Sequence, residues 1–256
     1  MFINYFIKKA EQNTSDKGGG NKKCFLVDDY ALLYGSYKEE DLKKQIQIGK
    51  SLEQQDVNIL PTLEYKTDTE PNVLGYVKGY SLQRRAQGEE LYKSKMSEDE
   101  YKKRLSTVAN MSTQQMDKFV SDWMAISEAG LMIDPSKCEN FFYSDGKISF
   151  IDLNVWNNRP SLDEHFLNMS QVLFGLGLKS KYKADENDFA KILTNVSRSF
   201  LKKGLPLEDI QKVSSKYTYF MSEGTINSVM NTLSKETSKD TSLTYAMAQK
   251  SGISGR

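Results

Sequence analysis

Residues 131–154 read LMIDPSKCENFFYSDGKISFIDLN and gather several polar side chains into one short segment. Two apolar runs, FFY and ISFI, flank the turn sequence SDGK, and this pattern predicts a β-hairpin. Such a hairpin returns the chain, so Asn140 and Asp152 are expected near the same end of it. An amide and a carboxylate beside a further acid, Asp134, are oxygen ligands of the kind that Mg²⁺ takes together with phosphate and water. The alternative is an ordinary surface hairpin with acidic ends, because Asp and Asn also favour turns.

The composition is that of a soluble globular protein with one large domain or two lobes. The 256 residues are 38% hydrophobic and 27% charged. Thirty-five basic residues against 34 acidic residues leave a formal net charge of +1, which gives no overall electrostatic signature for nucleic acid or a membrane surface. No apolar run approaches the roughly 18 residues that a spanning helix needs. We therefore expect neither a nucleic-acid partner nor a membrane span.

The cysteines and the N-terminus bear on the cellular compartment. Cys24 and Cys138 lie far apart and form no CxxC pair, so we expect thiols in a reducing cytoplasm rather than a disulfide or a zinc site. The first residues, MFINYFIKKAEQN, place apolar residues before charges, which is the reverse of a secretory signal. A cytoplasmic location without a classical signal peptide is the prediction, and export by a specialised route stays open.

The first part of the chain is predicted to be rich in strands. We expect strands at residues 2–7, 23–27, 30–34, 58–65 and 72–77, and one helix at 38–55. Between the first two strands lie Gly18, Gly19 and Gly20, whose backbone N–H groups could contact phosphate; a loose hairpin tip is the alternative. Residues 78–82 interrupt the strand pattern and are predicted to form a hinge.

Beyond that hinge the chain is predicted to be almost entirely helical. Helices are expected at residues 81–94, 98–110, 113–129, 160–174, 185–203 and 206–221, with weak helices after 222 and a frayed end at SGISGR. The prediction is an α+β protein with a small antiparallel β lobe, residues 1–78, and a helical lobe, residues 79–256, that carries the hairpin.

This order of elements resembles the two-lobed protein-kinase-like fold, a class that includes protein kinases and small-molecule phosphotransferases of the aminoglycoside-kinase type. The segment DPSKCENFF, which begins at Asp134, is similar to the catalytic loop of that family, and ISFIDLN, which ends at Asn154, is similar to its metal-binding DFG segment. Residues 73–82, with GYVKGYSL at their heart, look like the strand and linker that carry the adenine-binding backbone. The resemblance covers residues 18–175.

The resemblance implies ATP and Mg²⁺ as cofactors and a role for each matching residue. Asp134 would orient or deprotonate the attacking hydroxyl, and Lys137 would offer positive charge to the transferring phosphoryl group. Asn140 and Asp152 would hold Mg²⁺. Two alternatives stay open, because Lys137 could be a solvated loop lysine and Asp134 a turn or cap residue.

The nucleotide-binding half of the resemblance rests on weaker matches. Tyr76 and Val77 would lie against the adenine, and Gly18, Gly19 and Gly20 against the phosphates. The family carries an ATP-anchoring lysine on its third strand, but here Leu33 occupies that position. Lys22 or Lys23, from the neighbouring strand, could substitute for it.

Other departures from the family pattern also matter. The interval from Asp134 to Asn140 is six residues, where the family has five, so the loop must bulge. Asn154 stands in place of the DFG glycine, and the glutamate that pairs with the strand lysine falls near Gln45. Only residues 154–161 separate the metal segment from the next helix, so no long activation loop is expected.

These observations predict an ATP- and Mg²⁺-dependent phosphotransferase, specifically an atypical Ser/Thr protein kinase that acts on a protein substrate. Two other functions stay open. The absent strand lysine favours a pseudokinase, a binding module that uses the fold without transferring phosphate. The plain hinge and the short segment after Asp152 favour a small-molecule phosphotransferase. The sequence does not determine the oligomeric state.

Overall fold

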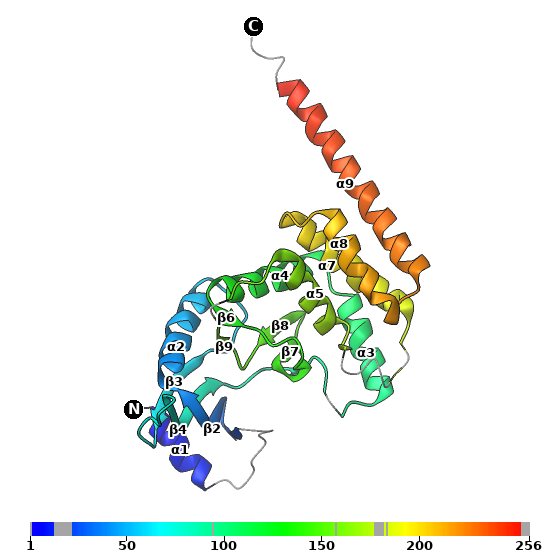
Figure 1. Ribbon diagram of the computed structural model, residues 1–256. Coiled ribbons are helices and arrows are strands. Elements are labelled where there is room, and N and C mark those ends of the chain that lie inside the picture. The colour runs from blue at the N-terminus through cyan, green and yellow to red at the C-terminus, as the bar shows by residue number, and fades with distance from the viewer. Residues whose placement is uncertain are drawn as a thin grey trace. The chain divides into compact units, whose positions relative to one another are not determined.

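The computed structural model describes residues 2–12, 22–93, 95–156, 158–176, 182 and 184–251, with side chains as far as residue 238. The chain forms two units: Met1–Lys93 with Ser121–Arg159, and Ser94–Val120 with Pro160–Arg256. They are called unit 1 and unit 2 below, and most of their helices and strands are labelled in Figure 1. The lobe boundary expected after residue 78 stays a prediction.

Unit 1 holds the β-structure, two whole helices and the last part of a third. Its elements are α1 (Ile3–Glu11), β1 (Lys23–Val27), β2 (Tyr30–Lys38), α2 (Glu39–Gln54), β3 (Thr62–Thr67), β4 (Tyr76–Arg84), β5 (Glu89–Glu90), the part of α4 (Thr113–Glu128) that follows Val120, β6 (Leu131–Met132), the 3₁₀ turn η1 (Cys138–Asn140), β7 (Phe141–Ser144), β8 (Lys147–Phe150) and β9 (Asn154–Val155). Four of the strands form an antiparallel sheet in the order β1-β2-β4-β3.

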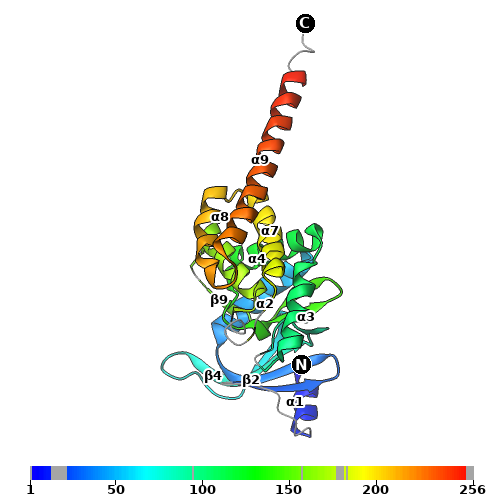
Figure 2. The same ribbon diagram turned by 90° about the vertical axis from the view of Figure 1, so that its right-hand side faces the viewer.

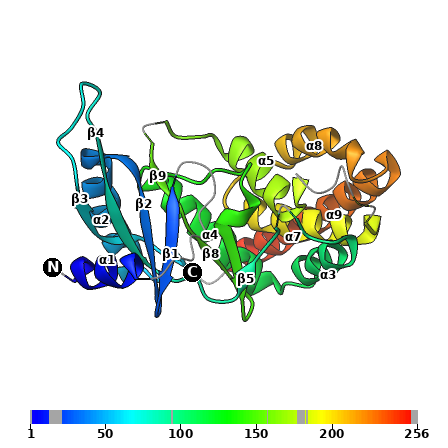
Figure 3. The same cartoon turned by 90° about the horizontal axis from the view of Figure 1, so that it is seen from below.

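The first element is a helix, so the prediction of a strand at residues 2–7 is wrong. The apolar residues of α1 recur three or four positions apart, which is helical spacing, and this face is buried. They are Ile3, Phe6, Ile7 and Ala10. They pack against Val27, Leu32 and Leu82 on one face of the sheet, as Figure 3 shows for the helix as a whole. The sheet therefore has four strands where five were expected.

The hinge predicted at residues 78–82 is also wrong, because these residues lie inside β4. This strand is central and pairs with β2 and β3 at once, so Gly79 is opposite both Gly35 and Thr67. A Cβ atom at Gly79 would lie 2.3 Å from the carbonyl oxygen of Lys66. The glycine thus permits a close approach of β3 and is not a sign of flexibility.

The helix predicted at residues 81–94 is also wrong, because residues 81–93, the part of it that the structure describes, form no helix. The backbone N–H of Arg85 donates to the carbonyl of Asp29, and the N–H of Leu91 donates to Phe141. Glu90 in β5 pairs with Phe142. Because these backbone groups bond to distant segments of the chain, they are not available for helical hydrogen bonds.

The predicted hairpin is confirmed as β7 and β8, joined by Asp145 and Gly146. Its strands pair from Phe141 opposite Phe150 to Ser144 opposite Lys147. Phe141 and Phe150 are fully buried, and both rings pack on Trp123 of α4, with the Phe141 ring stacked on the indole at 5.9 Å. This aromatic packing fixes the hairpin against the helix that precedes it.

Unit 2 is helical, which confirms most of the predicted helices after residue 97. Its elements are α3 (Glu98–Ala109), the first part of α4, α5 (Leu162–Leu173), α7 (Glu186–Lys202), α8 (Leu207–Ser214), the 3₁₀ turn η2 (Ser215–Tyr219) and α9 (Glu223–Ser251). Capping boxes at Ser97 and Ser161 start α3 and α5. Figure 2 shows α7, α8 and the first part of α9 side by side, and Arg198 of α7 makes two hydrogen bonds to Glu236 of α9.

The predicted α+β class, with a small antiparallel sheet and a separate helical part, is confirmed. Among the described residues, no helix combines the length and the apolar character that crossing a membrane requires. Cys24 and Cys138 are not joined by a disulfide.

Candidate functional site

The loop before the hairpin consists of two successive tight turns. The N–H of Lys137 donates to the carbonyl of Asp134 at 3.3 Å, and the N–H of Asn140 donates to the carbonyl of Lys137 at 3.0 Å. Each hydrogen bond spans three residues, so the six-residue interval is two turns of equal length. The additional residue relative to the family pattern is accommodated in this way.

Asp134 is held by its own turn. Its Oδ1 atom accepts hydrogen bonds from the N–H and the hydroxyl of Ser136, at 3.0 and 2.6 Å. Its Oδ2 atom lies 3.8 Å from the ammonium of Lys137. One carboxylate oxygen therefore orients the group, while the other faces the cation. The turn role that the sequence left open for Asp134 is observed for one of its two oxygens only.

Asp152 is the point where the charged groups meet. Lys22 Nζ lies 2.7 Å from its Oδ1 atom, and Lys137 Nζ lies 3.9 Å from its Oδ2 atom. Lys137 consequently lies within ion-pair distance of both carboxylates, Asp134 and Asp152. Two lysines and two aspartates thus form one cluster, and all four belong to unit 1.

The hairpin register places Asn140 beside this cluster. The N–H of Ile151 donates to the carbonyl of Asn140 at 3.0 Å, immediately beyond the pair formed by Phe141 and Phe150. Asn140 and Asp152 therefore lie at the same end of the hairpin, as the sequence predicts. Asp152 adopts a left-handed backbone conformation with φ of 52°, which aspartate tolerates better than most residues.

Strand alternation separates the two candidate lysines. Phe25 and Val27 of β1 pack with α1, so Lys23, two residues before Phe25, lies on that same face of the sheet and is exposed. Lys22 lies on the opposite face, where its ammonium reaches Asp152. Of the two lysines, the structure directs Lys22 alone to the cluster.

The same alternation places Leu33 and Tyr37 of β2 on the face of Lys22. Tyr37 is 9% exposed, and the ammonium of Lys22 lies 5.3 Å from the centre of its ring. Its hydroxyl is 3.2 Å from both the carbonyl of Leu33 and the hydroxyl of Ser81. Burial, which outweighs the opposing effect of the Ser81 hydrogen bond, raises the pKa of Tyr37 to about 12. The phenol is therefore neutral at physiological pH.

Tyr37 is the residue that sequence reasoning missed. A tyrosine in a strand is most simply a core residue, and nothing in the letters alone connects it with a lysine fifteen positions earlier. The available signal was the period of two in β2, which places Tyr37 on the same face as Leu33, the position that the resemblance singles out.

The donor chemistry of Asn140 and Asp152 fits a magnesium ion bound together with phosphate. Asn140 is 8% exposed, and within the described residues its side-chain amide has no hydrogen-bond partner. Asp152 already faces cationic groups on both oxygens. No group of three or more His, Cys, Asp or Glu side chains in the described part of the chain could hold a metal by itself. A two-ligand site completed by phosphate and water is what Mg²⁺ commonly uses.

The residues expected to contact adenine lie at the far end of β4 from Arg84. Tyr76 is 39% exposed at the start of this strand, and the ammonium of Lys38 lies 5.4 Å from the centre of its ring. Val77 is 1% exposed and belongs to a core cluster with Tyr37 and Leu42. Their role in nucleotide binding stays a prediction. The linker expected within residues 73–82 is not found there, because the chain leaves the sheet only after Arg84. The other expected phosphate contacts, Gly18, Gly19 and Gly20, lie outside the described residues.

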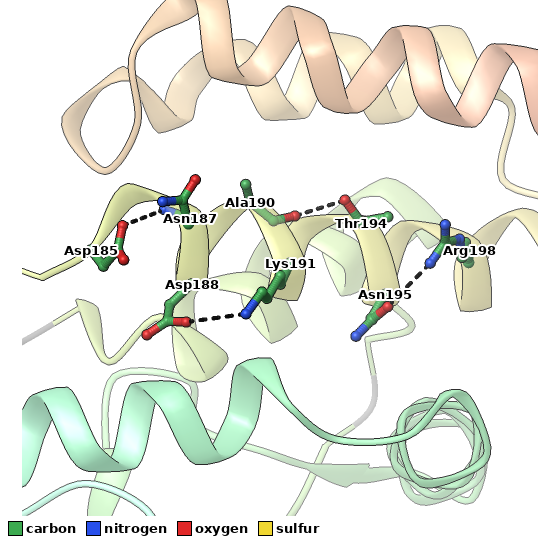
Figure 4. A pocket seen from close by; sticks show the side chains of 8 residues that line it. All are labelled: Asp185, Asn187, Asp188, Ala190, Lys191, Thr194, Asn195 and Arg198. Carbon is green, nitrogen blue, oxygen red and sulfur yellow. Dashed lines mark hydrogen bonds and ion pairs between the residues drawn. The ribbon is translucent and has the colours of Figure 1, made fainter.

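A separate depression of about 540 Å³ follows α7 in unit 2 (Figure 4). It is lined by Asp185, Asn187, Asp188, Ala190, Lys191, Thr194, Asn195 and Arg198. All eight residues come from α7 and its N-cap, and several bond to one another, as Asp188 and Lys191 do at 3.9 Å. None of the residues predicted to be functional lines it.

Comparison with known proteins returns solved structures only. No protein-family model and no curated protein matches this chain. It is similar to a choline/ethanolamine kinase family protein from Mesorhizobium loti, with 11% identity, 93% of this chain and 88% of that chain covered and a TM-score of 0.41. It is also similar to an aminoglycoside phosphotransferase from Alicyclobacillus acidocaldarius, with 10% identity, 93% and 92% covered and a TM-score of 0.36. A third similar structure is aminoglycoside phosphotransferase APH(4)-Ia, with 11% identity, 90% and 97% covered and a TM-score of 0.33.

Proposed function

We propose that this chain is a phosphotransferase of the protein-kinase-like fold that uses ATP and Mg²⁺ and transfers phosphate to a hydroxyl group of a protein. The observation that carries the proposal is the cluster at the end of the hairpin, where Lys22, Lys137, Asp134 and Asp152 meet beside Asn140. Phosphoryl transfer depends mainly on positioning and on neutralising charge, so these few side chains suffice for it.

In the proposed reaction the acceptor oxygen attacks the γ-phosphorus of ATP. A bond forms between that oxygen and phosphorus, the bond from phosphorus to the β,γ-bridging oxygen breaks, and ADP leaves with the electron pair. Asp134 takes the proton of the hydroxyl through Oδ2, because Oδ1 is engaged by Ser136. Lys137, within 4 Å of both carboxylates, offers positive charge to the transferring group.

Asn140 and Asp152 would hold the magnesium ion, which neutralises negative charge on the phosphate oxygens when it is bound. Lys22 fills the role of the lysine that the family carries on the neighbouring strand. Its ion pair with Asp152 is partly exposed, so a nucleotide phosphate can compete for the ammonium. Because Lys137 also faces Asp152, this carboxylate keeps a cationic neighbour when Lys22 turns to phosphate.

A second candidate function is a pseudokinase, which binds nucleotide without transferring phosphate. The observation that favours it is on β2, whose face toward the cluster presents Leu33 and Tyr37 and no lysine. Gln45 of α2, near the position of the usual glutamate, accepts a hydrogen bond from Thr62 instead of pairing with a cation. The usual pair of strand lysine and helix glutamate is therefore replaced as a unit.

One assay separates these functions. The purified chain is incubated with ATP labelled at the γ-phosphate and with Mg²⁺, alone and with cell lysate, beside Asp134→Ala and Asp152→Ala. Glu139→Ala is the matched control, because this acid is exposed in the same loop and takes no part in the cluster. We expect labelled protein bands with the native chain and with Glu139→Ala, and a loss of at least about a hundredfold in the other two variants.

The other outcomes decide against the proposal in different ways. Label confined to small molecules refutes the protein substrate and leaves the phosphotransferase. Thermal stabilisation by ATP without any transfer supports the pseudokinase. Equal labelling with Asp152→Ala and with the native chain refutes the proposed site.

A further inference from the structure

We propose that Tyr37 is a positioning residue for Lys22: its ring holds the ammonium toward the phosphates of ATP through a cation–π contact, in place of a carboxylate on helix α2. This inference rests on the proposed function, because it concerns how the phosphate-binding lysine of that site is oriented. It assigns a role to a residue that belongs to no recognised motif of the chain.

The ring of Tyr37 is itself held in one place. Its hydroxyl lies 3.2 Å from the hydroxyl of Ser81 on β4 and 3.2 Å from the carbonyl of Leu33 on its own strand. Val77, directly opposite Tyr37 in the strand register, and Leu42 of α2 pack around it in the core. A ring fixed by two hydrogen bonds and by packing on two elements is a rigid surface for a cation.

Lys22 meets this ring from the end of the neighbouring strand. Its ammonium lies 5.3 Å from the ring centre and 2.7 Å from Asp152. Within the part of the chain that the structure describes, Asp152 is its single ion-pair partner. A cation at this distance from the centre of an aromatic ring is attracted by the negative face of the ring.

An aromatic partner differs chemically from a carboxylate. A glutamate would add a second anion that competes with phosphate for the lysine, whereas the ring of Tyr37 is uncharged and leaves Asp152, among the described residues, as the one carboxylate that phosphate has to displace. The position of Lys22 also follows from strand pairing, because the next residue, Lys23, is in register with Tyr34. Strand pairing and the Tyr37 ring therefore orient Lys22. Helix α2 takes no part in this, because its Gln45 accepts a hydrogen bond from Thr62 instead.

Three variants test the contact through ATP turnover. Tyr37→Leu removes the ring and is expected to raise the KM for ATP by about twofold to thirtyfold, the range that a cation–π contact supports. Tyr37→Phe keeps the ring and is expected to change that KM by less than about twofold. Tyr34→Leu is the control, because Tyr34 lies on the opposite face of the sheet, where its ring packs against that of Tyr80 with 4.7 Å between the ring centres. A KM unchanged in Tyr37→Leu overturns the inference.

A double-mutant cycle shows whether Tyr37 acts through Lys22. If it does, Tyr37→Leu has no further effect on the KM for ATP in a Lys22→Met background. The same four proteins are unfolded in urea, which measures the coupling between the two side chains without any reference to activity. Absence of coupling in urea overturns the inference even if the chain turns over no ATP. Coupling in urea without ATP binding or turnover refutes the proposed function and keeps the contact.

Discussion

Replacing Lys22 by methionine removes the ammonium that lies 2.7 Å from Asp152 and keeps most of the length of the side chain. The side chains of this ion pair are 31% and 28% exposed, so solvent screens the pair, and it contributes about 0–1 kcal/mol to the free energy of unfolding. In a chain of this size about 1 kcal/mol corresponds to a shift in Tm of about 2–4 °C. Loss of the cation–π contact with Tyr37 adds about 0.5–1 kcal/mol at this partly exposed site, so the free energy of unfolding is expected to fall by at most about 2 kcal/mol.

Activity is expected to change much more. Removing one charged or hydrogen-bonding group that stabilises a transition state costs about a hundredfold to a thousandfold in rate. The matched control is Lys23→Met, since Lys23 is the adjacent residue, has the same chemistry and is exposed on the other face of the sheet. Initial rates of ATP turnover and thermal unfolding curves are measured for the native chain and both variants.

Two results would refute this reasoning. Equal rates in Lys22→Met and Lys23→Met would mean that Lys22 does not contact the phosphates. A fall in Tm well beyond about 8 °C for Lys22→Met would mean that Lys22 has a larger role in stabilising the fold, so that a loss of activity could not be assigned to phosphate binding.

Two further predictions concern the stability of the fold. Gly79→Ala would place a Cβ atom 2.3 Å from the Lys66 carbonyl oxygen, and we expect it to lower the free energy of unfolding in urea by about 1–3 kcal/mol. The control is Gly224→Ala in α9, where the atom nearest to the added Cβ is Ser222 Oγ at 3.9 Å. This variant should be neutral or stabilising, because alanine is favoured over glycine in a helix. An unchanged urea midpoint for Gly79→Ala would contradict its place in a central strand. In unit 2, partial burial acts to raise the pKa of Asp117, but hydrogen bonds from Lys202 and Ser199 outweigh it and lower the pKa below its usual value. Because the folded-state pKa is lowered, this carboxylate stabilises the fold above about pH 4, and the contribution is lost as pH falls through the lowered value. The difference in urea midpoint between the native chain and Asp117→Asn should therefore shrink from about pH 7 to about pH 3, and a constant difference would refute the pairing.

The hairpin and the helix starts could be predicted from the sequence, because residues within a few positions of one another specify them. The hairpin needs two apolar runs joined by an Asp-Gly turn, and the structure has these at β7 and β8. Helices α3 and α5 begin at Ser with Glu three residues later, which is a capping signal in the sequence itself. The six-residue interval from Asp134 to Asn140 could be seen in the sequence to differ from the family pattern. That it forms two tight turns could be learned only from the structure.

The errors arose where a residue's role depends on a distant neighbour. Gly79 reads as a strand breaker, yet it is glycine because the carbonyl of Lys66 lies too close for a side chain. Ile3 and Phe6 fit either a short strand or a helix in a window of six residues, and packing against the sheet decided for the helix.

The sequence by itself determined the mixed fold class, the hairpin, and the set of Asp134, Lys137, Asn140 and Asp152 as candidate functional residues. It determined them because residue type, turn chemistry and short spacings are local properties. Only the tertiary structure decided between Lys22 and Lys23, since the register of β1 on β2 sets which face each side chain occupies. It alone also brought Tyr37 to that lysine, because a contact between two strands depends on pairing that no short stretch of sequence encodes.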